Sequence, residues 1–222
     1  MLLELLLPQR CAGCGARADA LCPSCRRLLH QLEAPLCARC GAPTAWPVAR
    51  CRECAGRRIA FAQARSAVAY DRTVRRLVAG WKERGLRRVA GLAAGLVVEV
   101  VPRPAADALA WVPPDRDRGL ERGHSTARGL AGELARAWEL EPMSLLARTR
   151  AVAPQRGLSL PERRRNVVGA FRARRRSPRR VCLVDDVYTT GATVSAAASA
   201  LRAAGAKEVV VVTFARTLRR LD

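Results

Sequence analysis

The sequence has few aromatic residues and no long apolar run, and each absence excludes something. Aromatic side chains make up 4% of the 222 residues, so we expect a core built from valine, leucine and alanine. No apolar stretch approaches the roughly 20 residues that span a bilayer, which argues against a membrane anchor. The opening residues 1–7 contain Glu4 and lack a basic start. We therefore expect no signal peptide and a cytoplasmic protein.

Lysine is also rare, because Lys82 and Lys207 are the only two in the chain. Arginine supplies the other 38 of the 40 basic residues, against 19 acidic ones, and the net charge is +21. This balance predicts an anionic partner such as an acidic small molecule, a phosphate or a nucleic acid. Twelve arginines and one acid lie between positions 148 and 180. We take Arg174, Arg175 and Arg176 in this run as nucleic-acid candidates, the alternative being a solvated arginine-rich loop.

Cysteine is abundant, and eight of the nine cysteines lie before residue 55 as four C-x-x-C pairs. Two such pairs complete a tetrahedral set of four thiolates suited to Zn2+, so residues 1–60 are predicted to be a double zinc ribbon with two structural zinc ions. Glycine follows the first and third pairs, which favours sequential pairing; interleaved pairing is the alternative. A set of disulfides is the alternative to zinc, and it would need an oxidising compartment. The pairs are Cys11/Cys14, Cys22/Cys25, Cys37/Cys40 and Cys51/Cys54.

From residue 64 onward, short β-like runs alternate with helical patterns. We predict strands at 65–70, 108–112, 180–184 and 209–214, and helices at 74–81, 89–100, 120–138 and 193–204. Such alternation is typical of βαβ units with a mainly parallel sheet. Residues 61–222 are therefore expected to form one α/β domain, with ligands at the carboxyl ends of the strands.

Two adjacent acids, Asp185 and Asp186, follow the apolar strand that begins near position 180. A loop of small and hydroxyl residues then leads directly into a helix. Its backbone amides, hydroxyls and helix dipole suit a phosphate, and the carboxylates suit ribose hydroxyls. The alternative is a solvated acid pair with a turn that caps the helix. The loop residues are Thr189, Thr190, Gly191, Ala192 and Thr193.

This segment resembles the motif that binds 5-phosphoribosyl 1-diphosphate (PRPP) in type I phosphoribosyltransferases. Nearly the whole chain resembles the ComF family of competence-associated proteins. Besides the four cysteine pairs and the acid pair, the resemblance rests on Tyr70, Trp81-Lys82, Gly85, Val112-Pro-Pro, Arg116, Arg118, Arg122-Gly123, Gln155, Leu158, Arg163, Asn166 and Gly169-Ala-Phe171. It implies a type I phosphoribosyltransferase-like fold and a link to DNA uptake in natural competence.

The resemblance also implies roles for matching positions. Asp185 and Asp186 would hold the ribose 2′ and 3′ hydroxyls, and 189–193 would wrap the 5′-phosphate. A loop at 113–118 would meet the diphosphate with Mg2+, under a hood formed by roughly 150–166. The diphosphate and hood candidates are Pro114, Arg116, Arg118, Arg122, Arg163 and Asn166.

Two departures from the family pattern matter. Family members commonly have Arg-Gly-Phe-Asn-Gln where this chain has Arg122-Gly-His124-Ser-Thr. We expect His124 to be a solvent-exposed residue at a helix start, and the alternative is a polar replacement with a role of its own. Purine-salvage relatives place an aspartate where this chain has Thr189, which disfavours six-oxopurine substrates. The sequence predicts a phosphoribosyltransferase of unknown acceptor. The alternatives are an accessory protein that binds single-stranded DNA, or ribbons that dock a helicase-like competence partner.

Overall fold

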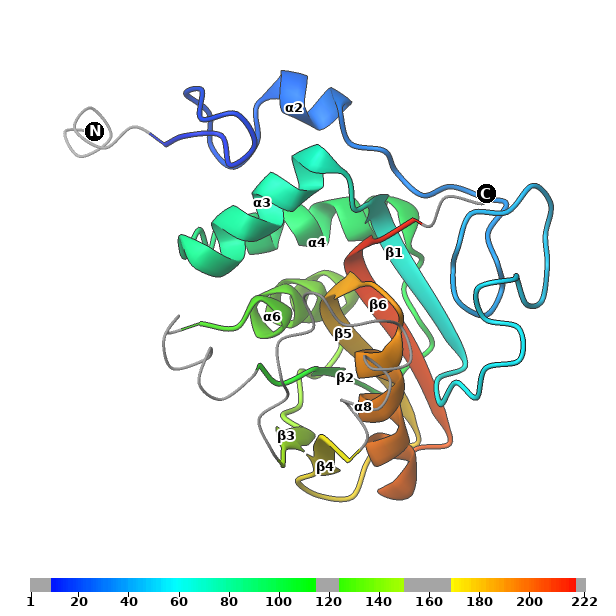
Figure 1. The fold of residues 1–222 in the computed structure, drawn as a ribbon. Coiled ribbons are helices and arrows are strands. Elements are labelled where there is room, and N and C mark those ends of the chain that lie inside the picture. The colour runs from blue at the N-terminus through cyan, green and yellow to red at the C-terminus, as the bar shows by residue number, and fades with distance from the viewer. Residues whose placement is uncertain (1–8, 115–123, 150–168, 219–222) are drawn as a thin grey trace.

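A four-stranded parallel sheet lies at the centre of the computed structural model, which describes residues 9–114, 124–149 and 169–218. The strand order is β1 (Gln63–Ala69), β6 (Glu208–Arg216), β5 (Arg180–Tyr188) and β2 (Ala108–Trp111) (Figure 1). Each neighbouring pair is parallel. All four carboxyl ends therefore share one edge, and the predicted α/β fold with a parallel sheet is confirmed.

Helices cover both faces of this sheet. α3 (Arg72–Glu83), α4 (Val89–Val100) and α6 (Thr126–Trp138) lie on one side, and α8 (Ala192–Ala203) lies on the other (Figure 1). Capping residues define two helix starts. Asp71 accepts a hydrogen bond from the Val74 amide at 2.9 Å, and Ser125 accepts one from the Arg128 amide at 3.2 Å. These side chains satisfy amides that have no partner inside the helix.

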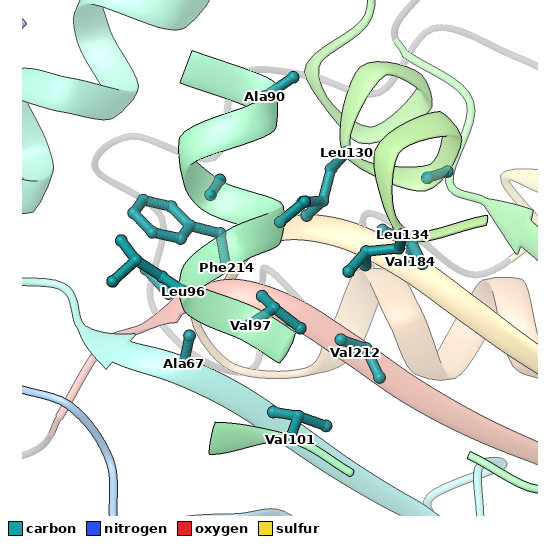
Figure 2. Close-up of a cluster of buried hydrophobic side chains, with 14 of the residues drawn as sticks. Ala67, Ala90, Leu96, Val97, Val101, Leu130, Leu134, Val184, Val212 and Phe214 are labelled. Atoms are coloured by element: carbon teal, nitrogen blue, oxygen red, sulfur yellow. The ribbon is translucent and has the colours of Figure 1, made fainter. Parts of the chain in front are cut away.

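Aliphatic side chains fill the first core, between the sheet and the helices α3, α4 and α6. Figure 2 shows Leu96 and Val97 of α4 facing the sheet beside Leu130 and Leu134 of α6. Val184, Val212 and Phe214 supply the strand side of the same cluster. Valine, leucine and alanine dominate this cluster, as the low aromatic content predicts.

The second core lies on the opposite face, beneath α8. It contains Val181 and Leu183 of β5, and also Cys37, Cys40 and Cys54. A small antiparallel hairpin of β3 (Leu146–Arg148) and β4 (Phe171–Ala173) completes this side. The sequence pattern missed the hairpin, because strands of three residues are too short to show a period of two.

The strand that carries the acid pair is longer than predicted. β5 does not end at Val184 but continues to Tyr188, which pairs with Arg216 of β6. Acidic side chains do not interrupt the backbone ladder, so Asp185 and Asp186 lie within the strand. A short helix, α2 (Pro23–Arg27), was also not predicted. Among the described residues, no helix has both the length and the apolarity needed to cross a membrane.

Candidate functional site

Asp186 lies at the carboxyl edge of the sheet, on the face of α3 and α6. The residue is 7% exposed, and both of its carboxylate oxygens have protein partners. Lys82 Nζ of α3 lies 2.7 Å from Oδ1, and the Thr126 hydroxyl of α6 donates to Oδ2. A buried carboxylate needs such partners, since burying it without them is costly. Asp186 thus joins β5 to two helices.

Sequence reasoning gave Lys82 no role, although one signal was available. Lys82 is one of only two lysines in a chain with 38 arginines. Burial opposes its positive charge, but Asp186 and Asp185 outweigh burial and raise the pKa of Lys82. A compact ammonium can bond one carboxylate oxygen and leave the other to Thr126, whereas a guanidinium fork tends to engage both. This explains why lysine occurs here.

Asp185 lies on the opposite face of the sheet from Asp186. Side chains alternate along a strand, and Leu183 before it packs in the second core while Val184 packs in the first. Burial, followed by repulsion from Asp186, raises the pKa of Asp185 to about 7, against the opposing effect of Lys82. The Asp186 amide donates to Asp185 Oδ1 at 2.9 Å. The second carboxylate oxygen of Asp185 accepts no hydrogen bond from the described residues.

The loop 189–193, here called the phosphate loop, leads from β5 into α8. Gly191 is the residue before the helix and has φ +72°. A Cβ at Gly191 would lie 2.3 Å from Tyr188 Oη, so neither the backbone angle nor the space suits another residue. The Thr190 hydroxyl accepts a hydrogen bond from the Ala192 amide at 3.2 Å. The bend is therefore compact and packs directly on the Tyr188 ring.

The predicted diphosphate side is described only in part. Pro114 is exposed just beyond β2, whereas Arg116, Arg118, Arg122, Arg163 and Asn166 lie outside the described residues. Arg148 of β3 donates from Nε to the Pro113 carbonyl at 3.1 Å, and its guanidinium carbon lies 4.9 Å from the Phe171 ring centroid. This arginine brings positive charge close to Asp185, whose pKa it lowers in part.

His124 differs from the expectation of a solvent-exposed residue. It is partly buried, and its Nε2 lies 2.6 Å from the carbonyl oxygen of Trp81. The ring therefore joins the start of α6 to the end of α3, one residue before Lys82.

The arginines at 174–176 lie away from the acid pair. All three are exposed and follow β4, and the Arg176 side chain lies near Gly205, just beyond the carboxyl end of α8. The acid pair lies near the amino end of α8, a helix of 12 residues that spans about 18 Å. Arg174 also supports the hairpin, because its Nε donates to the Leu146 carbonyl at 3.1 Å. The two candidate anion sites are therefore separate.

An open groove of about 860 Å³ runs beside α8 and does not contain the acid pair. Its lining includes Arg50, Arg57 and Arg58 together with small residues of α8 such as Ala192 and Ser195. The groove is basic and borders the phosphate loop, but it is not the predicted sugar-phosphate site.

The eight N-terminal cysteines form two groups of four in sequential order. Cys11, Cys14, Cys22 and Cys25 make the first group, and Cys37, Cys40, Cys51 and Cys54 make the second. Neighbouring sulfur atoms lie 3.7 Å apart for Cys14 and Cys22, and 3.4 Å apart for Cys40 and Cys51. Four sulfurs about 2.3 Å from one zinc lie about 3.8 Å from each other. Both groups therefore fit a structural Zn2+ ion.

Backbone amides prepare one thiolate in each group. Burial raises the pKa of the Cys11 thiol, but amides led by that of Cys22 outweigh burial and lower the pKa to about 6. Burial likewise opposes ionisation of Cys37, and backbone amides lower its pKa to about 7. Because zinc binds the thiolate form, these amides favour metal binding.

The N-terminal part of the chain matches a known zinc-binding family, and most of the chain matches known bacterial proteins. Residues 2–55 match the family described as the double zinc ribbon domain. The chain is 27% identical over 223 residues to competence protein F of Haemophilus influenzae, covering 93% of this chain and 96% of that protein. It is 30% identical over 210 residues to the DNA utilization protein YhgH of Salmonella typhimurium, covering 89% and 91%.

A solved structure of the allosteric regulatory enzyme of purine biosynthesis is also similar to part of the chain. It shares 26% identity, with a TM-score of 0.38, and the likeness covers 56% of this chain and 25% of that one. This score is too low to define a fold.

Proposed function

The chain belongs to the ComF family, and from that premise we propose that it binds PRPP at the acid pair and the phosphate loop, as a phosphoribosyltransferase-like protein linked to DNA uptake. The names of its relatives, competence protein F and DNA utilization protein, support the link to DNA uptake. The observation that carries the proposal is the β5–loop–α8 unit, which brings Asp185 next to a hydroxyl-rich bend at the carboxyl edge of a parallel sheet.

The phosphate loop is proposed to hold the 5′-phosphate. The amino end of α8 carries a partial positive charge, and its first amides can donate to phosphate oxygens. Gly191 has no side chain to cap this helix, whereas the Thr190 hydroxyl accepts from the Ala192 amide and would have to turn away for that amide to donate to a phosphate. The hydroxyl groups of the neighbouring threonines add further donors.

Asp185 is proposed to accept the ribose hydroxyls most directly. Its second carboxylate oxygen has no donor among the described residues, whereas both oxygens of Asp186 bond to Lys82 and Thr126. Asp186 would contact the ribose only while sharing its oxygens with these partners. We therefore assign Asp185 to sugar binding and assign Asp186 chiefly to holding β5 in place.

Mg2+ would accompany the diphosphate and neutralise its charge. Its usual ligands are a few carboxylate, water and phosphate oxygens, and the two acids provide too few free oxygens for an all-protein cage. The acid pair therefore fits a cation bound mainly through substrate oxygens. Arg148, beside the Pro113 carbonyl, would add positive charge on the diphosphate side.

As an enzyme, the protein would orient PRPP while an acceptor displaces diphosphate from the anomeric carbon. A bond forms between that carbon and the acceptor, the bond to the diphosphate oxygen breaks, and the acceptor loses its proton to solvent. The chain's contribution would be ribose orientation and charge stabilisation. No residue is assigned as the base for the acceptor.

Calorimetry with PRPP and Mg2+ tests the sugar-phosphate site. Asp185→Asn should abolish or strongly weaken the heat of binding, because an amide cannot replace both acceptor oxygens. Asp107→Asn is the matched control, because it makes the same substitution at the amino end of β2, where Asp107 pairs with Arg180. Equal heats for wild type and Asp185→Asn would remove Asp185 from the site, and no heat with wild type would remove PRPP as a ligand.

The second candidate function is binding of single-stranded DNA by Arg175 and Arg176. Both are exposed, Arg176 lies near the end of α8 away from the acid pair, and the name of the YhgH relative refers to DNA. Removing one arginine that binds a phosphate should reduce the salt slope of binding by about 0.7 for single strands. Fluorescence anisotropy should show weaker binding for Arg175→Ala/Arg176→Ala and unchanged binding for Asp185→Asn. The opposite pattern would place DNA at the acid pair.

A further inference from the structure

Two arginines connect the second ribbon (residues 37–54) to the phosphate loop. We propose that Arg57 and Arg216 are positioning residues for this loop, so that metal binding at the second cysteine group controls affinity for a ribose 5-phosphate group. This inference rests on the proposed function, because it assumes that the loop binds the 5′-phosphate.

Arg216 lies at the end of β6 and is fully buried. Its Nη1 donates to the carbonyl of Cys40 at 2.5 Å, and its Nη2 donates to Glu53 Oε2 at 2.9 Å. Both acceptors belong to the second ribbon, and Cys40 is one of its four sulfur ligands. A buried guanidinium needs these acceptors, so its position depends on the folded ribbon.

Tyr188 lies between Arg216 and the phosphate loop and contacts both. The β5–β6 register pairs Tyr188 with Arg216, and the guanidinium carbon lies 4.9 Å from the tyrosine ring centroid. Phe61 contacts the same ring edge-on, with the centroids 6.3 Å apart. The ring packs under Gly191, where a Cβ would be only 2.3 Å from Oη. A shift of Arg216 would therefore move the support beneath the bend.

Arg57 provides a second and more direct connection. Its Nη2 donates to the Thr190 carbonyl at 2.5 Å, and its Nη1 donates to the Glu53 carbonyl at 3.2 Å. The carbonyl of Thr190 and the amide of Gly191 share one planar trans peptide unit. Holding the carbonyl toward Arg57 consequently aims the Gly191 amide to the opposite side. Arg57 thus sets the direction of a donor in the phosphate loop.

The metal is part of this connection because Glu53 lies in the chain between two of its ligands, Cys51 and Cys54. Zinc would fix the turn from Cys51 to Cys54, and Glu53 in that turn accepts from Arg216 with its side chain and from Arg57 with its carbonyl. Loss of the metal would release both acceptors together. Each arginine would then lose the hydrogen bond that orients it toward the loop.

The first ribbon (residues 11–25) offers an internal control, because it packs elsewhere. Arg88 donates from Nε to the Asp19 carbonyl at 2.9 Å, and Arg26 pairs with Glu99 of α4. Ala12 belongs to the first core, with α3 and α4. Loss of the first metal should therefore disturb the helical face and leave the phosphate loop in place.

The main experiment compares Arg57→Ala with Arg58→Ala, which removes the same charge from the neighbouring exposed position. Calorimetry measures ribose 5-phosphate affinity, hydrogen exchange measures the amides of 189–193 without ligand, and elemental analysis measures zinc. We expect Arg57→Ala to bind at least about fivefold more weakly, the lower end of ordinary coupling between sites. It should also exchange faster at unchanged zinc content. Arg58→Ala should match wild type, and Arg57→Lys should be intermediate because one ammonium cannot bond both carbonyls well.

A second experiment compares the two ribbons. Cys37→Ser/Cys54→Ser should lose one zinc and show the weaker affinity and faster loop exchange. Cys11→Ser/Cys25→Ser should lose the other zinc and retain both loop properties. Equal effects of the two pairs, or wild-type loop exchange in Arg57→Ala, would overturn the positioning role. If wild type fails to bind ribose 5-phosphate, the proposed function is overturned, while the exchange rates of the unliganded variants still decide the positioning role.

Discussion

Removing Lys82 should leave the buried Asp186 carboxylate without its cation. The Lys82–Asp186 pair has a nitrogen–oxygen distance of 2.7 Å, and the two side chains are 30% and 11% exposed. Breaking a fully buried pair by deleting one partner costs about 3–5 kcal/mol. Solvent reaches part of the Lys82 side chain, so we expect a smaller cost of about 2–3 kcal/mol for Lys82→Met, just below that range.

Thermal unfolding monitored by tryptophan fluorescence measures this cost. For a chain of this size, each kcal/mol lowers Tm by about 2–4 °C, so Lys82→Met should melt about 4–12 °C below wild type. Lys207→Met is the matched control, because Lys207 is the other lysine and its side chain is exposed. That variant should melt within about 2 °C of wild type, because surface substitutions usually change stability by less than about 0.5 kcal/mol.

A double-mutant cycle separates the ion pair from packing. Asp186→Asn removes the unpaired charge, so adding it to Lys82→Met should recover most of the lost stability. Additive effects of the two substitutions would refute the reasoning, because they would mean that Lys82 and Asp186 stabilise the fold independently. A Tm for Lys82→Met equal to that of Lys207→Met would refute it as well.

Three further predictions concern the loop, the acid and the metals. Burial and Asp186 raise the pKa of Asp185 to about 7, so ribose 5-phosphate affinity in calorimetry should rise about tenfold from pH 6 to pH 8 if only the carboxylate binds. The rise remaining in Asp185→Asn belongs to the ligand's own phosphate, and equal pH slopes for the two proteins would exclude Asp185. Gly191→Ala should abolish ribose 5-phosphate binding. Gly85→Ala is the control, because Gly85 also has a positive φ but open space around its Cβ. It should keep the binding and lower the free energy of unfolding only by the backbone strain of about 1–2 kcal/mol. Elemental analysis should find two zinc ions per chain, and a chelator should lower Tm; a value near zero in protein purified under reducing conditions would contradict the metal assignment.

Local sequence patterns predicted the four strands of the parallel sheet and the four helices that cover it, but not β3, β4 or α2. Val74, Leu77, Val78 and Trp81 recur at helical spacing and form the buried face of α3. The apolar run that begins at Val181 gave the start of β5 but not its end, because Asp185 and Asp186 looked like the end of a strand. The backbone ladder with β6 continues regardless of side-chain polarity, so the pattern underestimated this strand.

The contacts that define the candidate site could not be read from such patterns, because they join distant parts of the chain. Lys82 meets Asp186 across 104 positions, and Arg57 meets Thr190 across 133. Arg216 resembles any other arginine near the end of a basic chain, yet it is fully buried. Only the packing of the second ribbon against β5 and β6 gives this arginine its acceptors. Among these site residues, only Lys82 carried a signal in the composition, as one of the two lysines of the chain.

The two ribbons are integral to the α/β fold because they join opposite sides of one sheet. The first ribbon places Ala12 in the core beneath α3 and α4, and the second places Cys37 and Cys54 in the core beneath α8. The acid pair is divided in the same way, since Asp186 faces the first side and Asp185 the second. Loss of the first metal should therefore act on Asp186 through the helices, whereas loss of the second should act on Asp185 and the phosphate loop. The two metal sites should consequently have different effects on stability and on ligand affinity.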